Sequence, residues 1–496
     1  MKKNIIICSM ALASLAICPS CTNLESEMYN VIGTDMFPKN EADAESLVTS
    51  AAYSPFRSNW YEGLFSSGQN GIHVITEMTT DIGYCQWNNI VWADLMGVNF
   101  TSNSASPTVI YKNYISDISK MTITIDRISS VPMDEELRKQ LIAELRCARG
   151  WLAYILYDLY GPVQVASLEM LKNPFLDDVA PRLSHEDMVT FIEEDLNAAK
   201  ILPPTYKTSD VNYGRFTRGL VYTVLMKLYM HENNWSKAVE CGRELMKPEY
   251  GYGLMDTYKD IFTLENEGNK EVIWSCVCSR SVNQQLWLAH VLSSQYPTKN
   301  KSIQKWGGYR VMWDFYHTFD SKDERLEVLV GNFKGTDGIQ YNEDNPGSVL
   351  AYGAMPIKYG EDPDATGEES QVDWIVYRYA DILTLLAEAI VRDGKIVTQE
   401  AVDLLNDVHT RAGLEPYQLT DFLNVDDFLN KVLEERGHEL WFEGVRRTDL
   451  IRFGKYIEYA KKYRKSSTAQ DYMTLMPLPQ SVIDESKGKI AQNPGY

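Results

Sequence analysis

Residues 217–246 read TRGLVYTVLMKLYMHENNWSKAVECGRELM, and this stretch predicts the fold class of the chain. In its first half, Leu220, Val224 and Leu228 recur at the spacing of one helical face. The second half has its apolar positions at Trp235, Ala238, Val239, Cys241 and Leu245. Because the polar pair Asn233-Asn234 separates the two halves, the stretch predicts two amphipathic helices packed as a hairpin.

The same pattern occurs elsewhere in the chain. Residues 377–412 predict a second hairpin with a turn at Asp393-Gly394. Residues 135–160 and 184–202 predict a third, in which Gly161-Pro162 ends the earlier helix. Repeated helical hairpins are typical of tetratricopeptide-like scaffolds. We therefore expect a mostly α fold, a tetratricopeptide-like helical-hairpin scaffold with long loop-rich insertions and a few short strands.

Two regions lack helical periodicity. Residues 274–373 are rich in Gly, Pro, Asn and Tyr and predict a loop-rich excursion with a few strands, and residues 60–106 are expected to be similarly irregular. Irregular loops on a rigid helical frame often carry binding surfaces. The body of the chain has five scattered cysteines without disulfide or zinc spacing, which we expect to be buried thiols: Cys85, Cys147, Cys241, Cys276 and Cys278.

The N-terminus has the pattern of an export signal. Lys2 and Lys3 precede the apolar run 5–17, which is shorter than the roughly 20 residues that cross a bilayer. Ser20-Cys21 at the end of this run resembles a bacterial lipobox, although Cys18 occupies a position that is usually aliphatic. We expect residues 1–20 to be a removed lipoprotein signal peptide and Cys21 to carry the lipid anchor, the alternative being an ordinary signal peptide cut elsewhere.

Composition restricts the class of ligand. The 496 residues include 48 basic and 68 acidic side chains, which gives a net charge of −20, and the hydrophobic content of 44% is ample for a folded core. A strongly negative chain repels phosphate backbones, so we expect no nucleic-acid partner.

Four motifs follow one another along the C-terminal half. They are YRYADILTLLAEA at 377–389, EERGHELWFEGVRRTDL at 434–450, MPLP at 476–479 and QNPGY at 492–496. In this order they resemble the SusD/RagB family. The resemblance divides the mature chain into an N-terminal SusD-like part, residues 21–270, with helical hairpins, and a C-terminal SusD/RagB part, residues 271–496, that includes the excursion 274–373.

The resemblance also implies a location and a role. Similar proteins are lipid-anchored on the outer face of the outer membrane and cover a SusC-like TonB-dependent transporter. They bind a nutrient without making or breaking covalent bonds. The expected function is therefore a non-enzymatic surface receptor that captures a glycan and delivers it to such a transporter, with no cofactor. A peptide-binding receptor of the same type, a lipid-anchored glycoside hydrolase and a pure protein-interaction scaffold remain the alternatives.

The acid-rich motif at 434–450 has a structural and a catalytic interpretation. Glu435, Glu439, Glu443 and Arg446 fall on one side of a helix, which predicts a charge network that holds the helix against its neighbours. Glycosidases also use two carboxylates about 5 to 10 Å apart. An ion-pair network is the favoured interpretation, because acid-rich helices are far more often structural.

Two aromatic segments are the candidate ligand site. Flat aromatic rings pack on the apolar faces of sugars while amides bind hydroxyls. The first segment, 84–92, contains Tyr84, Trp87, Asn88 and Trp92 in a stretch that looks irregular, and the second, 296–313, contains Tyr296, Trp306, Tyr309 and Trp313. The family's starch-binding member has an aromatic platform with a nearby asparagine in a comparable early loop, which favours Trp87 and Asn88. Core packing is the competing interpretation for each ring.

The acidic loop 362–373 has part of the pattern of a calcium loop. Asp362, Asp364 and Asp373 fall at the spacing of calcium ligands, but Pro363 and Thr366 depart from that pattern. A solvated acidic loop is the favoured interpretation, with structural calcium as the alternative.

Overall fold

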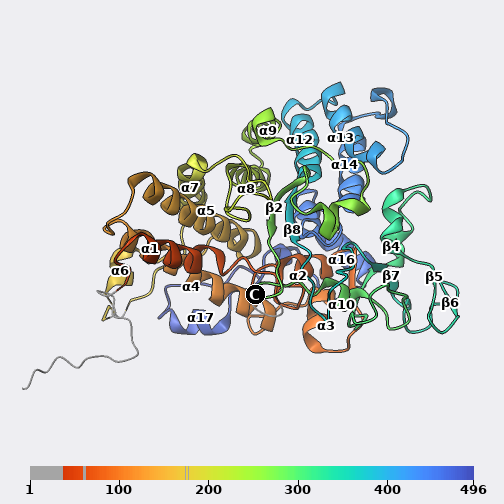
Figure 1. Cartoon of the computed structure of the whole chain (residues 1–496), viewed down its shortest axis with the longest axis horizontal. Helices are drawn as coiled ribbons and strands as arrows, with labels where there is room; N and C mark the ends of the chain where they lie inside the picture. Colours follow the sequence, from red (N-terminus) through yellow and green to blue (C-terminus); the bar gives the residue numbers. More distant parts are fainter. Residues whose placement is uncertain (1–36, 60–62, 174, 177) are drawn as a thin grey trace, which may run out of the picture.

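The computed structural model describes residues 37–59, 63–173, 175–176 and 178–496. Long helices form its frame and run from the left side of Figure 1 to the upper right, where α12, α13 and α14 lie together. Strands β4 to β7 lie at the lower right, away from the long helices. No helix within the described residues has the length and apolarity needed to cross a bilayer.

The helices confirm the predicted mostly α class and the three hairpins. The paired helices α5 and α7, α8 and α9, and α12 and α13 pack on each other, and α9 also packs on α12. Helices of the N-terminal half are α1 Glu41–Val48, α2 Ile72–Met78, α3 Ile90–Gly97, α4 Ala105–Ile128, α5 Glu135–Tyr160, α6 Leu168–Lys172, α7 His185–Ala198, α8 Arg218–His231 and α9 Trp235–Leu245. The later helices are α10 Trp287–Val291, α11 Trp313–Tyr316, α12 Tyr379–Gly394, α13 Gln399–Arg411, α14 Val425–Leu440, α15 Arg446–Arg452, α16 Tyr456–Tyr463 and α17 Gln480–Glu485.

The hairpin helices begin at side chains that cap them. The Asp134 carboxylate accepts hydrogen bonds from the first amides of α5. Ser184 accepts from the amide of Asp187 at 3.0 Å, and Thr217 accepts from the amide of Leu220 at 3.2 Å. The first amides of a helix have no partner within the helix, so these short polar side chains fix where α5, α7 and α8 start.

The strands are short and belong mostly to the predicted loop-rich excursion. They are β1 Gly83–Cys85, β2 Val272–Cys276, β3 Tyr309–Met312, β4 Leu329–Val330, β5 Phe333–Lys334, β6 Gln340–Tyr341, β7 Gly353–Pro356 and β8 Trp374–Arg378. An antiparallel sheet has the order β1-β3-β7-β4, and β2 pairs with β8 and β5 with β6. The excursion thus confirms the expected few strands.

One prediction about an irregular region was wrong. Residues 60–106 contain α2, β1 and α3 in their described part. The sequence signal was missing because β1 is held by pairing with the distant β3. The start of α3 is held by Asn89, whose side chain accepts from the amide of Trp92 at 3.1 Å. The five cysteines of the body, in contrast, are buried free thiols as predicted.

Aromatic packing joins the N-terminal and C-terminal parts into one core. The Trp151 ring on α5 stacks on Phe56 at a centroid distance of 4.4 Å and meets Trp274 of β2 edge-on at 5.2 Å. Its indole nitrogen donates to the Tyr377 hydroxyl of β8 at 3.0 Å. The two parts predicted at residues 21–270 and 271–496 therefore share a hydrophobic core rather than meeting across a solvated gap.

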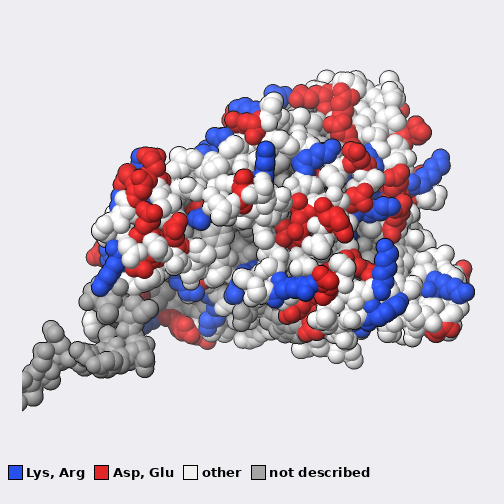
Figure 2. All heavy atoms as spheres, in the orientation of Figure 1, with Lys and Arg blue, Asp and Glu red and all other residues white. Residues whose placement is uncertain are grey.

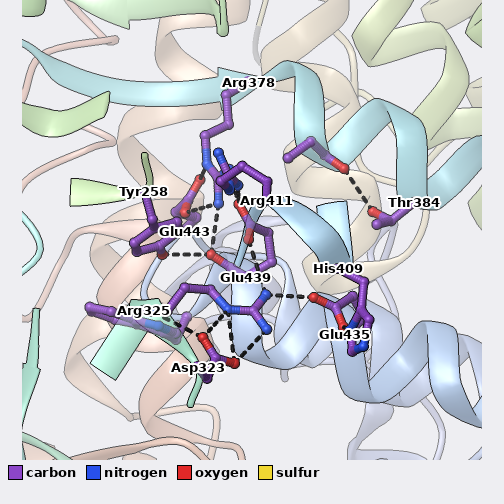
Figure 3. Close-up of polar contacts among 12 residues, drawn as sticks. Tyr258, Asp323, Arg325, Arg378, Thr384, His409, Arg411, Glu435, Glu439 and Glu443 are labelled. Atoms are coloured by element: carbon purple, nitrogen blue, oxygen red, sulfur yellow. Dashed lines mark hydrogen bonds and ion pairs between the residues drawn. The ribbon is translucent and has the colours of Figure 1, made fainter. Parts of the chain in front are cut away.

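A buried ion-pair network connects the excursion to the helices (Figure 3). Its centre is Glu439 of α14, whose carboxylate pairs with Arg325, Arg378 and Arg411. Arg325 belongs to the 3-10 helix Glu324–Glu327 of the excursion, Arg378 ends β8, and Arg411 ends α13. This network confirms the structural interpretation of the 434–450 motif.

Neighbouring acids complete the network. Arg378 also pairs with Glu443 and Glu271 at 2.7 Å each, and Lys358 donates to Glu443 at 2.6 Å. Burial alone would raise the pKa of Glu435, but the Arg325 charge and the His409 contact lower it to about 2. Burial lowers the pKa of Lys358 to about 8. The network thus stabilises the ionised form of its acids inside the core.

We expect Glu439→Gln to lower the free energy of unfolding by about 3–5 kcal/mol, because the substitution leaves buried guanidinium groups without their carboxylate. Urea-induced unfolding at pH 7 measures this effect. Glu434→Gln is the matched control, since the Glu434–Lys431 pair is exposed on the same helix at 3.0 Å and is expected to contribute less than about 1 kcal/mol. Equal stabilities of the two variants would contradict the role given to Glu439.

The pKa of Glu435 gives a second expectation. Because the folded-state pKa is depressed to about 2, ionised Glu435 stabilises the fold above its ordinary pKa of 4.5, and this stabilisation is lost as pH falls toward 2. The difference in unfolding free energy between the wild type and Glu435→Gln should therefore be largest near neutral pH and shrink between about pH 4.5 and 2. Urea titrations over this range measure it, and a difference independent of pH would exclude this linkage.

Candidate functional site

The sheet brings the two predicted aromatic segments together. Strand β1 of the first segment pairs with β3 of the second, with Tyr84 opposite Arg310 and Cys85 opposite Tyr309. The pairing continues past the strand, because the Gln86 backbone amide donates to the Gly308 carbonyl at 2.9 Å. Segments far apart in the sequence thus form one local structure.

Trp87 and Trp306 are the half-buried rings at the centre of this structure. Their centroids lie 6.5 Å apart, with ring planes inclined by 63°. Gly308 lies directly against Trp87, since a Cβ at position 308 would fall 2.3 Å from the indole ring. The glycine is therefore required for the two segments to approach this closely.

Trp92 and Tyr309 lie beneath these surface rings. Trp92 is 2% exposed and Tyr309 is 0% exposed, and the two buried rings meet edge-on at 5.4 Å. The Trp87 ring lies 5.4 Å from Tyr309 and 6.3 Å from Trp92. The Tyr309 hydroxyl donates to the Ser67 carbonyl at 2.7 Å. Trp92 and Tyr309, both predicted as ligand-binding residues, therefore belong to the core beneath Trp87, because α3 and β3 turn them inward.

The remaining predicted residues differ in their placement. Asn88 is exposed between β1 and α3, close in sequence to Trp87. Tyr296 packs against both the main core and a small second cluster, where its ring meets Phe333 edge-on at 5.2 Å. Trp313 packs edge-on against Tyr316 at 5.3 Å. The ring partners of Tyr296 and Trp313 therefore differ from those of Trp87, which are Trp92, His290, Trp306 and Tyr309.

Tyr352 is a surface residue that sequence reasoning missed. Its ring stacks on Tyr84 at 4.5 Å with an interplanar angle of 16°, and the residue is 49% exposed. Tyr352 directly precedes β7, which pairs with β3, so the sheet places it near Tyr84. One isolated tyrosine among thirty gave no signal in the sequence. We call Tyr84, Trp87, Trp306 and Tyr352 the aromatic platform.

Polar groups accompany the aromatic platform. The Gln86 side-chain nitrogen donates to the Gly307 carbonyl, whereas its side-chain oxygen is buried without a hydrogen-bond partner among the described residues. Asn88 offers an exposed amide next to Trp87. Flat rings beside amide groups can bind the apolar face and the hydroxyls of a sugar at the same time.

The acidic loop differs from the favoured prediction of a solvated segment. Asp362 is 2% exposed and accepts from the amides of Asp364 and Gln371 at 2.9 and 3.0 Å. Asp373 is 3% exposed and accepts from the Cys278 amide at 2.8 Å. Two of the three acids are therefore buried, because they satisfy backbone donors of the excursion.

The same three acids do not converge on one point. Asp364 is exposed and pairs with Arg280 at 2.8 Å, while the buried Asp373 also accepts from the Tyr213 hydroxyl at 2.8 Å. Across the part of the chain that the structure describes, no three His, Cys, Asp or Glu side chains gather as a metal ion would require. The geometry of Asp362, Asp364 and Asp373 thus gives no support to the calcium alternative.

Several cavities of the described chain lie outside the aromatic platform, and three of them are large. One of about 500 Å³ is lined by Tyr206, Tyr213, Tyr250, Tyr252 and Trp274 among others. A second, of about 580 Å³, shares part of this lining and also contacts Tyr53, Phe56, Val277 and Val282. A third, of about 340 Å³, contains two acids, but Asp81 is held by Arg446 at 2.7 Å and Glu434 by Lys431 at 3.0 Å.

Glu77 is an acid with a strongly raised pKa. Burial raises its pKa to about 8, and such a change often marks a catalytic acid. Glu77 is 0% exposed, however, and one of its oxygens accepts from the Arg446 amide at 3.3 Å. Its environment is that of a buried structural group, since none of the three cavities above reaches it.

Two family models match the chain. One, described as the SusD family, matches residues 340–496, and the other, described as starch-binding associating with outer membrane, matches residues 39–230. The first aromatic segment falls within the second match. Residues 296–313 of the second segment lie between the two matched regions.

Curated relatives and solved structures resemble nearly the whole chain. The starch-binding protein SusD of Bacteroides thetaiotaomicron is 21% identical over 86% of each chain, and the SusD-like protein P25 of Formosa agariphila is 22% identical over 96% of this chain and 95% of its own. A laminarin-binding SusD-like protein has a TM-score of 0.74 at 21% identity and covers 92% of this chain and 100% of its own.

A surface glycan-binding protein A of Bacteroides thetaiotaomicron, solved with laminarihexaose, has a TM-score of 0.72 at 21% identity and covers 92% of this chain and 100% of its own. These likenesses agree with the helical-hairpin frame and with the four C-terminal motifs found in the sequence. The chain belongs to the SusD/RagB family.

Proposed function

We propose that this protein is a non-enzymatic, lipid-anchored receptor on the outer face of the outer membrane. It captures a glycan and delivers it to a SusC-like TonB-dependent transporter. The aromatic platform is the observation that carries the proposal. The β1–β3 pairing joins the two aromatic segments, Trp87 lies 6.5 Å from Trp306, Tyr84 stacks on Tyr352, and the exposed Asn88 follows Trp87.

The comparisons support this proposal through the ligands of similar proteins. One relative is a starch-binding protein, and two solved neighbours bind laminarin or laminarihexaose. Two observations support a non-catalytic role: the acids in the 340 Å³ cavity are ion-paired, and Glu77 is buried. The anchor is proposed at Cys21, which lies outside the described residues.

We expect Trp87→Ala and Trp306→Ala each to weaken glycan binding at least about tenfold, which corresponds to about 1.4 kcal/mol. A glycan array identifies bound sugars, and calorimetry with the best of them measures the affinity. Trp235→Ala is the matched control, since Trp235 is a half-buried tryptophan on α9 that is not part of the platform. Unchanged affinity in both platform variants, with normal melting temperatures, would contradict this site.

The same glycan also tests the absence of catalysis. Incubation with the wild-type protein should produce no new reducing ends, because the proposed receptor only binds. Release of reducing sugar that is lost in a variant of an acid, such as Glu434→Gln, would instead support the glycoside hydrolase alternative.

The anchor gives a separate expectation. When the full chain is produced in a bacterium that exports lipoproteins, Cys21→Ser should abolish labelling by an alkyne fatty acid and release the protein from the membrane fraction. Cys18→Ser is the control, because Cys18 lies within the segment expected to be removed. Continued labelling of the Cys21 variant would exclude this anchor.

A further inference from the structure

Arg310 is a buried cation that has no carboxylate partner among the described residues. Its side chain is 0% exposed and lies on β3 opposite Tyr84 of the aromatic platform. The guanidinium donates to the carbonyls of Val349 at 2.8 Å and Val291 at 3.0 Å, and to that of its neighbour Tyr309. All of these partners are uncharged, so they do not neutralise the positive charge of Arg310.

Other fully buried arginines of the described chain differ in this respect. Arg325 and Arg378 pair with the Glu439 network. Arg436 pairs with Asp449 at 2.7 Å, and Arg447 pairs with Asp158 at 3.0 Å. Burial lowers the pKa of Arg310 to about 9, which agrees with the lack of a counter-ion in the described chain. Carboxylates thus neutralise the charges of these four arginines, whereas Arg310, which lies beneath the candidate site, has no carboxylate partner in the described chain.

The unpaired end of Arg310 faces the bend at Gly307, within the second aromatic segment. Its Nη2 atom has no hydrogen-bond partner among the described residues, and a Cβ added at Gly307 would lie 3.4 Å from it. Gln86 reaches the same residue, since its side-chain nitrogen donates to the Gly307 carbonyl while its side-chain oxygen lacks a partner in the described chain. Two unsatisfied polar groups thus border Gly307, next to Trp306 of the platform.

Further cations lie near this bend. Lys301 and Lys305 precede Trp306 and donate to backbone carbonyls, Lys305 to that of Tyr296 at 2.7 Å. Residues 299–310 contain four basic side chains and no acid. An acid from outside this stretch, Glu361, accepts from the amides of Lys299 and Asn300 at 3.2 and 2.9 Å and so binds backbone rather than a cationic side chain there. The acidic loop lies beside the start of this stretch, because Gly367 pairs with Ile303 and donates to the Ser302 carbonyl at 3.0 Å. The charge left without a carboxylate partner in the described chain is therefore that of Arg310 at the bend.

This local charge opposes the charge of the whole chain. The net charge is −20, and Figure 2 shows acidic and basic side chains interspersed over the face viewed. A polyanion is therefore repelled by the molecule as a whole and can be retained only where positive potential is concentrated. A buried, unpaired guanidinium contributes such potential strongly, because little water lies around it to screen its charge.

We propose that the glycan bound at the aromatic platform is anionic, carrying uronate carboxylates or sulfate esters that lie over the bend at Gly307. This inference rests on the function proposed above and adds the chemical class of the ligand. The rings bind the apolar face of a sugar, and the negative group compensates the charge of Arg310, to which the half-buried Lys305 adds. A neutral glycan would leave that charge uncompensated.

Matched polymers that differ only in charge test the inference. Affinity electrophoresis of the purified protein compares polygalacturonate with its methyl ester, and dextran sulfate with dextran, so that carboxylate and sulfate are distinguished. We expect at least one anionic member to bind about tenfold more tightly than its neutral partner at low salt, and the preference to shrink as the ionic strength rises. Equal retention of charged and neutral partners would overturn the inference.

Variants assign the preference to this site. Arg310→Met should reduce the preference for the anionic polymer, and Lys305→Gln is a variant nearer the surface that should reduce it even if Arg310→Met fails to fold. Lys395→Gln, at the exposed end of α12, should leave it unchanged. A preference that persists in Lys305→Gln and in a folded Arg310→Met would contradict the role given to these cations.

The outcomes also separate this inference from the proposed function. If the protein binds a neutral glycan and Trp87→Ala abolishes that binding, the proposed receptor function stands and only the assignment of an anionic ligand is lost. Anion binding that is unchanged in Trp87→Ala and Trp306→Ala would place the polyanion elsewhere and overturn the assignment to the platform. If polyglutamate binds as tightly as polygalacturonate, the result would indicate an acidic peptide as the ligand and overturn the proposal of a glycan ligand.

Discussion

The carboxylate of Glu439 is the contact on which the arrangement of this protein depends. Arginines from three separate elements converge on it: Arg325 from the excursion, Arg378 from β8 and Arg411 from α13. The acid and these bases are buried, so each would carry a large desolvation cost without the others. The network therefore requires the excursion, the strand and the helices to be in place together.

The rigid frame and the candidate ligand surface are therefore formed by different parts of the chain. The helical hairpins and the network supply rigidity, and the excursion, held at Arg325 and Lys358, supplies β3 and the second aromatic segment. The first segment and the network helices lie within regions matched by family models, whereas residues 296–313 lie between them. Trp306 is therefore the one platform residue outside both matched regions, since Tyr84 and Trp87 fall within residues 39–230 and Tyr352 falls within residues 340–496.

The sequence was informative wherever local rules decide the structure. Helical periodicity and the polar turns Asn233-Asn234 and Asp393-Gly394 predicted the hairpins. The spacing of Glu435, Glu439 and Glu443 predicted a charge network. The bases that reach these acids from the excursion could not be predicted, because no local spacing relates Arg325 to Glu439. Both aromatic segments were found from composition, but the burial of Trp92 and Tyr309 and the exposure of Tyr352 depend on pairing between distant strands. Such long-range pairing leaves no periodic signal in a single sequence.

A crystal structure of the protein with the glycan selected on an array is the most direct test of whether the aromatic platform binds the ligand. We expect sugar rings against Trp87 and Trp306, with further density toward the stacked pair Tyr84 and Tyr352. Sugar bound instead in the 500 Å³ cavity beside Trp274, with the platform empty, would contradict it.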